Sequence, residues 1–169
     1  MLTPPFPHNE TERLNALFET GLLDSLPEER FDRLTRIAQR LFKVPYAMVS
    51  LVDSKRQWFK SKQGLDTCET SRDISFCGHA ILEENLFEVQ DASKDPRFAD
   101  NPLVLGVPFV RFYAGVPIHT PDRFAIGTLC IVDDRPRQLS EDDKRALYDL
   151  ADCINDEIAW HLEKINQQQ

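Results

Sequence analysis

The sequence has no long apolar run and no excess of basic residues. No segment approaches the roughly 20 consecutive apolar residues that a membrane-spanning helix needs. The N-terminus has neither the basic start nor the apolar core of a signal peptide. The formal net charge is −8, which argues against a nucleic-acid partner, because neutralising phosphates requires Lys and Arg in excess on one face. We therefore expect a cytoplasmic protein with no membrane partner.

Cysteine is scarce, and its spacing is not that of a metal-binding motif. The four cysteines are Cys68, Cys77, Cys130 and Cys153, and no two of them form a Cys-x-x-Cys pair. A zinc knuckle is therefore not expected. In a reducing compartment the four side chains should be thiols, some of them simply small core residues. We predict no metal, and the sequence does not indicate a cofactor.

The remaining composition is that of one globular domain. Hydrophobic residues make up 41% of the 169 positions and charged residues 28%, enough for one substantial core. Residues 1–8 are rich in proline, which predicts an extended, poorly ordered arm. Residues 9–169 would then form the single domain.

Apolar residues at helical spacing predict two helices near the N-terminus. The first runs from Asn9, a suitable N-cap, to about residue 20, where Gly21 ends it. The second begins at Ser25-x-x-Glu28, a capping-box pattern, and ends before Pro45. An apolar stripe should pack this helix on a flat surface. The stripe consists of Phe31, Leu34, Ala38 and Leu41, with Ile37 beside them.

A third helix is predicted over about residues 140–165, with Ser140 as its cap and acidic residues in its first turn. Its apolar residues recur at spacings of three and four: Leu147, Leu150, Ala151, Ile154, Ile158, Leu162 and Ile165. An apolar stripe of this length extends beyond the surface that its own domain can cover. We expect its distal half to pack on its twin in a homodimer; the alternative is that the end of the helix frays.

Two β-hairpins are predicted, over residues 46–63 and 112–132. The first strand of the first hairpin is apolar at nearly every position, so both of its faces should be covered. Trp58 and Phe59 are adjacent on its second strand and should face opposite sides of the sheet. In the second hairpin, Gly127 would allow another segment to approach closely.

Between the hairpins the sequence predicts short elements and a long loop. Residues 74–83 suit a short helix with Ser75 as its N-cap, and residues 86–89 suit a short strand. Residues 91–108 contain several helix- and strand-breaking residues. A loop of this length in a compact domain is typically functional or covers a ligand.

The stretch Ser-Phe-Cys-Gly-His-Ala at residues 75–80 concentrates chemical groups. A position at a helix start lowers a thiol's pKa, and Arg72 and His79 lie near Cys77 in sequence. Cys77 is therefore either a reactive thiol or part of a pocket wall, and the weak Cys-x-His pattern favours the wall. As a metal pair, Cys77 and His79 would need two further ligands that no local cluster supplies.

Charged and polar residues also gather between residues 91 and 111. They are Asp91, Asp95, Arg97, Asp100, Asn101 and Arg111. One interpretation is a polar lid in which Arg97 or Arg111 grips an anion by a bidentate contact. The other is a self-satisfying loop, in which each aspartate caps a turn and each arginine ties two segments together.

The order of these elements resembles that of a GAF domain, over about residues 10–165. The resemblance is strongest in the segments Leu51–Asp53, Arg56–Ser61, Asp73–Leu82, Asp95–Pro102, Arg111–Gly115 and Gly127–Cys130. These segments are similar to GAF domains that precede bacterial histidine kinases and diguanylate cyclases. The resemblance implies an α+β fold, related to PAS domains. A central antiparallel sheet of about six strands would carry helices on one face and pocket-forming loops and short helices on the other.

The resemblance also implies a function: a sensory or regulatory module that binds a small molecule or partner and signals through terminal helices in a homodimer. Because the chain carries no kinase or cyclase motif, its effector would lie in another chain, or the domain would act alone. We expect no catalytic residues and an unknown small ligand. The candidate pocket residues are Phe76, Cys77, His79, Asp91, Arg97, Phe98, Asn101, Arg111, Tyr113 and Gly115.

Two alternatives remain open. One is a thiol reductase of the free methionine sulfoxide type centred on Cys77. That branch of the family uses three clustered cysteines; Cys68 and Cys77 resemble such a pair, but Cys130 lies far downstream and the surrounding motifs differ. The other is a pure dimerisation scaffold with no ligand. The bilin, cyclic-nucleotide and haem or iron–sulfur patterns of other GAF domains are not matched.

Overall fold

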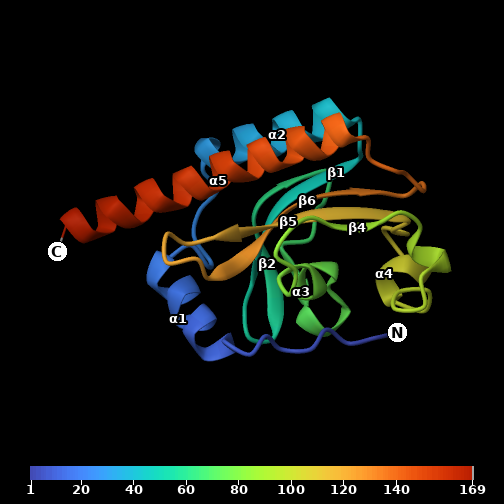
Figure 1. The fold of residues 1–169 in the computed structure, drawn as a ribbon, viewed down its shortest axis with the longest axis horizontal. Coiled ribbons are helices and arrows are strands. Elements are labelled where there is room, and N and C mark those ends of the chain that lie inside the picture. Colours follow the sequence, from blue (N-terminus) through green and yellow to red (C-terminus); the bar gives the residue numbers. More distant parts are fainter. Residues whose placement is uncertain (169) are drawn as a thin grey trace.

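A six-stranded antiparallel sheet separates two layers of the molecule (Figure 1). In the computed structural model, which describes residues 1–168, the strand order is β3-β2-β1-β6-β5-β4. The strands are β1 (Tyr46–Val52), β2 (Arg56–Gln63), β3 (Glu69–Ser71), β4 (Phe87–Val89), β5 (Phe112–His119) and β6 (Ala125–Asp133). The helices are α1 (Glu10–Thr20), α2 (Glu29–Phe42), α3 (Phe76–Ala80), α4 (Pro102–Leu105) and α5 (Glu141–Gln167).

The two layers have separate apolar cores. Helices α2 and α5 cover one face of the sheet, and the short helices α3 and α4 lie on the other (Figure 1). Helix α1 contributes Ala16 and Leu17 to the core beneath α2 and α5. Alternation along each strand divides the side chains: on β6, Ile131 enters the core under the long helices, whereas Cys130 enters the core under α3. This arrangement confirms the expected α+β fold class, with helices on one face and pocket-forming elements on the other.

Both predicted hairpins are confirmed, and they pair with each other through β1 and β6. A Cβ on Gly127 would overlap the carbonyl oxygen of Ser50 on β1, so only glycine allows these two strands to approach as they do. The three-residue strand β3, at the free edge, was not expected from its polar sequence. The loop at 91–108 also contains an element that was not expected, the single turn of α4.

Helix α2 differs from the sequence prediction at its start and in its buried face. Its N-cap is Glu28, which makes no side-chain cap bond, and the Ser25 hydroxyl instead donates to the carbonyl of Leu22 at 2.6 Å. The capping-box prediction is therefore wrong. The buried residues are Phe31, Thr35, Ala38 and Phe42.

The side chains of Ile37 and Leu41, expected in or beside the buried stripe, are 44% and 54% exposed. Polar contacts between α2 and β2 explain this exposure. The Thr35 and Ser61 hydroxyl oxygens lie 2.8 Å apart, and the Ser61 hydroxyl donates to the Asp32 carboxylate at 2.6 Å. These contacts with β2 determine which side of α2 faces the sheet.

Helix α5 begins as predicted, with a capping box between Ser140 and Asp143. Of its stripe, Leu147, Ala151, Ile154 and Ile158 are buried, whereas Leu150, Leu162 and Ile165 are only partly covered. The C-terminal end of α5 projects past the sheet (Figure 1). Gln169, the last residue of the expected domain, lies outside the described residues. Within residues 1–168, no helix is both long and apolar enough to cross a membrane.

The N-terminal arm is extended, but it is docked on the domain and not free as its proline content suggested. The Leu2 amide donates to the Arg97 carbonyl at 3.0 Å. Pro4 is buried against Gly78, where an added Cβ would lie 2.8 Å from the proline ring. The arm thus covers the outer side of α3 (Figure 1), and the contacts of Leu2 and Pro4 hold the arm in place.

Candidate functional site

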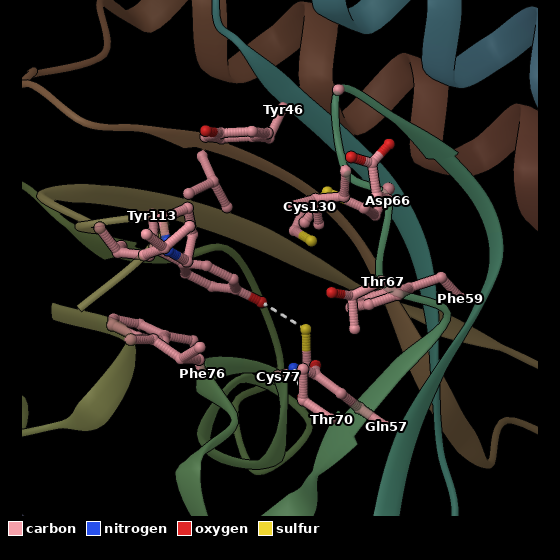
Figure 2. A pocket seen from close by; sticks show the side chains of 18 residues that line it. Tyr46, Gln57, Phe59, Asp66, Thr67, Thr70, Phe76, Cys77, Tyr113 and Cys130 are labelled. Carbon is pink, nitrogen blue, oxygen red and sulfur yellow. Dashed lines mark hydrogen bonds between the residues drawn. The ribbon is translucent and has the colours of Figure 1, made fainter.

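A cavity of about 400 Å³ lies between the sheet and α3 (Figure 2). Helix α3 and the segments 64–67 and 103–110 enclose it against strands β1, β2, β5 and β6. The side chains that line it include Met48, Gln57, Phe59, Asp66, Thr70, Phe76, Cys77, Tyr113, Cys130 and Val132. Of the ten candidates from the sequence, the fold brings Phe76, Cys77 and Tyr113 to this cavity.

Helix α3 positions Cys77 at the cavity wall. Ser75 caps this short helix, as predicted, by accepting a hydrogen bond from the Gly78 amide at 3.0 Å. The Cys77 sulfur lies 3.1 Å from the Tyr113 hydroxyl (Figure 2) and 3.1 Å from the Thr128 hydroxyl. The thiol is therefore buried among polar groups that can donate to it.

These neighbours change the ionisation of the thiol. Burial raises the pKa of Cys77, but hydrogen bonds from Cys130, Thr128 and Tyr113 outweigh it and bring the pKa to about 7. The pKa of Cys130 is raised instead, by its hydrogen bond to Cys77 and by burial. Burial and the nearby sulfurs also raise the pKa of Tyr113. Cys77 is thus the group in this cluster that loses its proton first.

Gly115 does not line the cavity itself but makes room for Tyr113, which does. The two residues are two positions apart on β5 and so share one face of the sheet. A Cβ on Gly115 would overlap the Tyr113 hydroxyl and ring. Glycine at 115 therefore lets the Tyr113 ring lie along its own strand and reach Cys77.

Phe98 and His79 support the wall from behind. The Phe98 ring is fully buried and stacks on Phe76, with ring centroids 4.2 Å apart. The His79 ring meets the edge of Phe98, and its Nε2 lies 3.0 Å from the Leu2 carbonyl oxygen. A carbonyl only accepts, so Nε2 carries the proton. Burial lowers the pKa of His79.

The polar residues of the loop satisfy one another and do not line the cavity. Asp91 caps a turn at Ala92–Lys94, and Asn101 caps α4 and donates to the Ile74 carbonyl at 3.0 Å. Arg97 pairs with Asp95 at 2.6 Å. Arg111 donates to the carbonyls of Val104 and Val110, both at 3.0 Å. These contacts are those of the self-satisfying loop, and neither arginine lines the cavity; Asp91 and Arg97 border a separate open hollow beside β4.

Gln57 is the main lining residue that the sequence interpretation missed. Its side chain is buried, its Nε2 donates to the Thr70 hydroxyl at 2.6 Å, and its Oε1 has no partner in the described structure. Phe59 lines the cavity and Trp58 packs on the opposite side, as predicted. The same alternation would have placed Gln57 beside Phe59, which is the signal that was available.

The described residues do not bring three potential metal ligands together. Within 1–168, no group of three His, Cys, Asp or Glu side chains is placed to hold a metal ion. Cys68 and Cys153 are exposed thiols, and Cys77 and Cys130 are buried thiols at the cavity. The cavity therefore offers thiols, hydroxyls, one amide, aromatic rings and the carboxylate of Asp66.

Comparison with known proteins identifies the family. The family model described as "GAF domain" matches residues 26–158, and the chain belongs to this family. A cyclic di-GMP phosphodiesterase of Pseudomonas aeruginosa is 44% identical over 137 residues. That match covers 81% of this chain but only 23% of the Pseudomonas protein.

Solved structures share the fold at low identity. A domain of a putative two-component sensor histidine kinase from Sinorhizobium meliloti aligns with a TM-score of 0.64 and 16% identity, over 84% of this chain and 97% of that one. A free methionine-R-sulfoxide reductase from Neisseria meningitidis, solved with its substrate, aligns with a TM-score of 0.63 and 19% identity over the whole of both chains. Identities this low establish the fold and not the activity.

Proposed function

We propose that the protein is a sensory module in which a small molecule binds in the cavity and shifts the arrangement of α5 in a homodimer. The observation that carries this proposal is the position of the cavity. Tyr113 and Cys130 line it from β5 and β6, while their neighbours Ala114 and Ile131 enter the core beneath the long helices. Only the thickness of the sheet separates the ligand site from α5.

Hydrogen bonds connect α5 to the same strands. The Asn155 carboxamide of α5 accepts from the His119 amide at the end of β5, at 2.9 Å. The Tyr148 hydroxyl accepts from the Leu86 amide just before β4, at 2.8 Å. A ligand that moves β5 would therefore also move the groups bound to α5. If the ligand binds one arrangement of α5 more tightly than another, it shifts the equilibrium between them by that difference in affinity.

The proposed dimer surface is the outer side of α2 and α5. Ile37 and Leu41 lie one turn apart on α2 and are exposed, and Trp160 on α5 is 47% exposed. The two helices run side by side (Figure 1). Apolar side chains on adjacent helices are suited to pairing with the same surface of a second copy.

The effector would lie in another domain or another chain. The Pseudomonas relative carries a matching segment within a much longer polypeptide named for a phosphodiesterase activity. We propose that residues 9–169 work as one regulatory domain of this kind, in the cytoplasm, where four free thiols are stable.

Native mass spectrometry of the purified protein tests both parts of the proposal. We expect a dimer that carries a small adduct. Replacing both exposed residues (Ile37→Lys and Leu41→Lys) should give a monomer that keeps the adduct, while Leu26→Lys, at an 82% exposed position, should leave the dimer intact. A monomeric wild-type protein at high concentration would contradict the dimer, and a protein that binds no small molecule under any condition would contradict the sensor.

A thiol-dependent reductase is a second candidate, supported by one observation. The fold brings Cys130 to the same cavity as Cys77, although the two are far apart in sequence. Two thiols could reduce a sulfoxide to a sulfide, giving one disulfide and one water. If Cys77→Ser retains full turnover of free methionine sulfoxide, this candidate is excluded. A pure dimerisation scaffold with a filled pocket agrees less well with the structure, because a cavity of about 400 Å³ is present.

A further inference from the structure

We propose that the cavity selects small ligands that combine an apolar body with an N–H donor and carry no anionic group, and that Gln57 binds the donor. This inference rests on the proposed ligand-binding function and specifies which chemistry the cavity accepts. It is supported by three properties of the lining: an unsatisfied amide, the sign of its charge and its aromatic walls.

The Gln57 amide is incompletely satisfied. The side chain is only 5% exposed and lines the cavity. Its Nε2 donates to Thr70, so one end of the amide is engaged, while Oε1 has no partner among the described residues. A buried carbonyl oxygen without a donor costs free energy. Oε1 itself is covered by neighbouring protein atoms in this structure, so a small rotation of the Gln57 side chain would bring it to a ligand N–H and remove that cost.

The charges of the lining disfavour anions. Among the described residues that line the cavity there is no Lys, Arg or His, whereas Asp66 lies at its edge (Figure 2). The nearby Lys62 ammonium is held by the carbonyl oxygens of Asp66 and Thr67, at 2.8 and 3.1 Å, and does not line the cavity. A buried carboxylate or phosphate would therefore have no cationic partner.

The walls are suited to a flat apolar body. Tyr46, Phe59, Phe76 and Tyr113 contribute rings from four different elements. Phe76 and Tyr113 stack on each other with centroids 5.2 Å apart, which fixes one wall. A bicyclic aromatic molecule fits well within about 400 Å³ and would bury its surface against these rings.

Four probes of similar shape separate the requirements. Indole is neutral and has an N–H donor, benzofuran replaces that donor by an oxygen acceptor, tryptamine adds a cation, and indole-3-acetate adds an anion. Each is titrated into the protein and into its Gln57 variants, and the dissociation constant is measured by calorimetry. In the wild type the side-chain amide signals of glutamine in NMR spectra report where the probe binds. Gln57→Leu assigns the Gln57 signal, which reports binding in this cavity.

We expect indole and tryptamine to bind and to shift the Gln57 signal, and indole to bind about tenfold more tightly than benzofuran. Indole-3-acetate should bind weakest. Gln57→Leu keeps the volume of the side chain but removes the amide, so the preference for indole over benzofuran should vanish. Gln57→Glu should strengthen tryptamine binding. Gln138→Leu, at an exposed position outside the cavity, is the control that should change nothing.

Two other results overturn the inference in different ways. If indole-3-acetate or benzofuran binds as tightly as indole, or if Gln57→Leu keeps the preference, the selectivity is wrong but the cavity remains a binding site. If no probe of any charge shifts the Gln57 signal at millimolar concentration, the selectivity is wrong and the proposed ligand-binding function falls with it.

Discussion

The sulfur of Cys77 lies 3.1 Å from the hydroxyl oxygen of Tyr113, and this contact joins α3 to β5 across the edge of the cavity. Tyr113 reaches the sulfur because Gly115 leaves room for its ring. Phe76 then packs on Tyr113, and Phe98 packs on Phe76. Gly115, which has no side chain, therefore helps to set the position of the pocket wall formed by these rings.

The first prediction concerns the reactivity of Cys77. Because its pKa is about 7, alkylation by iodoacetamide should rise with a midpoint near that pH, measured by peptide mass spectrometry. Tyr113→Phe removes a donor to the sulfur, so the midpoint should move to higher pH. Cys153 is the internal control, because burial and neighbouring acidic residues raise its pKa. Identical pH profiles for Cys77 and Cys153 would contradict this description of the cluster.

The second prediction concerns Gly115. In Gly115→Ala, the new methyl group should displace the Tyr113 ring from the sulfur, so the alkylation midpoint of Cys77 should rise as it does in Tyr113→Phe. The free energy of unfolding should fall by about 1–3 kcal/mol, measured by urea denaturation. Gly106→Ala is the matched control, because its added Cβ would come no closer than 3.3 Å to the nearest atom. An unchanged Cys77 profile in Gly115→Ala would show that Tyr113 is not held in this way.

The third prediction concerns pH and the docked arm. Burial, with a smaller contribution from the charge of Arg97, lowers the pKa of His79 below 6.5, whereas the bond to Leu2 and the charge of Asp95 oppose this. The unfolded chain therefore binds a proton more readily, and stability should fall as the pH falls below about 6.5. His79→Gln should lack this pH dependence, which contributes at most about 1.4 kcal/mol per pH unit to the slope of the free energy of unfolding against pH.

His119 also has a pKa lowered by burial, but it is present in both proteins and cancels in the difference. Parallel curves of stability against pH for the wild type and His79→Gln would contradict the assignment. The arm should stay docked as His79 gains a proton, because the imidazolium still donates from Nε2 to the Leu2 carbonyl. Hydrogen exchange at the Leu2 amide, bonded to Arg97, reports whether the arm stays docked.

Periodicity and caps predicted most elements of this fold, because each depends on residues close together in the chain. The two hairpins, α3 with its Ser75 cap, and α5 with its Ser140 cap follow from such local patterns. The orientation of α2 could not be predicted in this way. It depends on contacts of Asp32 and Thr35 with Ser61 on another element, and these require the tertiary fold.

The candidate site was predictable only in part, for the same reason. Phe76, Cys77 and Tyr113 carry recognisable chemistry and do line the cavity. Arg97 and Arg111 carry equally conspicuous charges, but Asp95 and backbone carbonyls satisfy them, and no sequence pattern distinguishes a free guanidinium from a satisfied one. The contribution of Cys130 to the cavity depends on the alignment of β6 beside β5 and β1.

Hydrogen exchange along α5 tests the central claim most directly. The protein is compared with and without tryptamine at a concentration that saturates the Gln57 signal, and exchange is measured at residues 147–165. Coupling through β5 and β6 predicts altered protection along this part of α5. In Gln57→Leu the alteration should require a higher tryptamine concentration, in proportion to the lower affinity. Saturated binding in the cavity with unchanged exchange throughout α5 would contradict a sensor that signals through this helix.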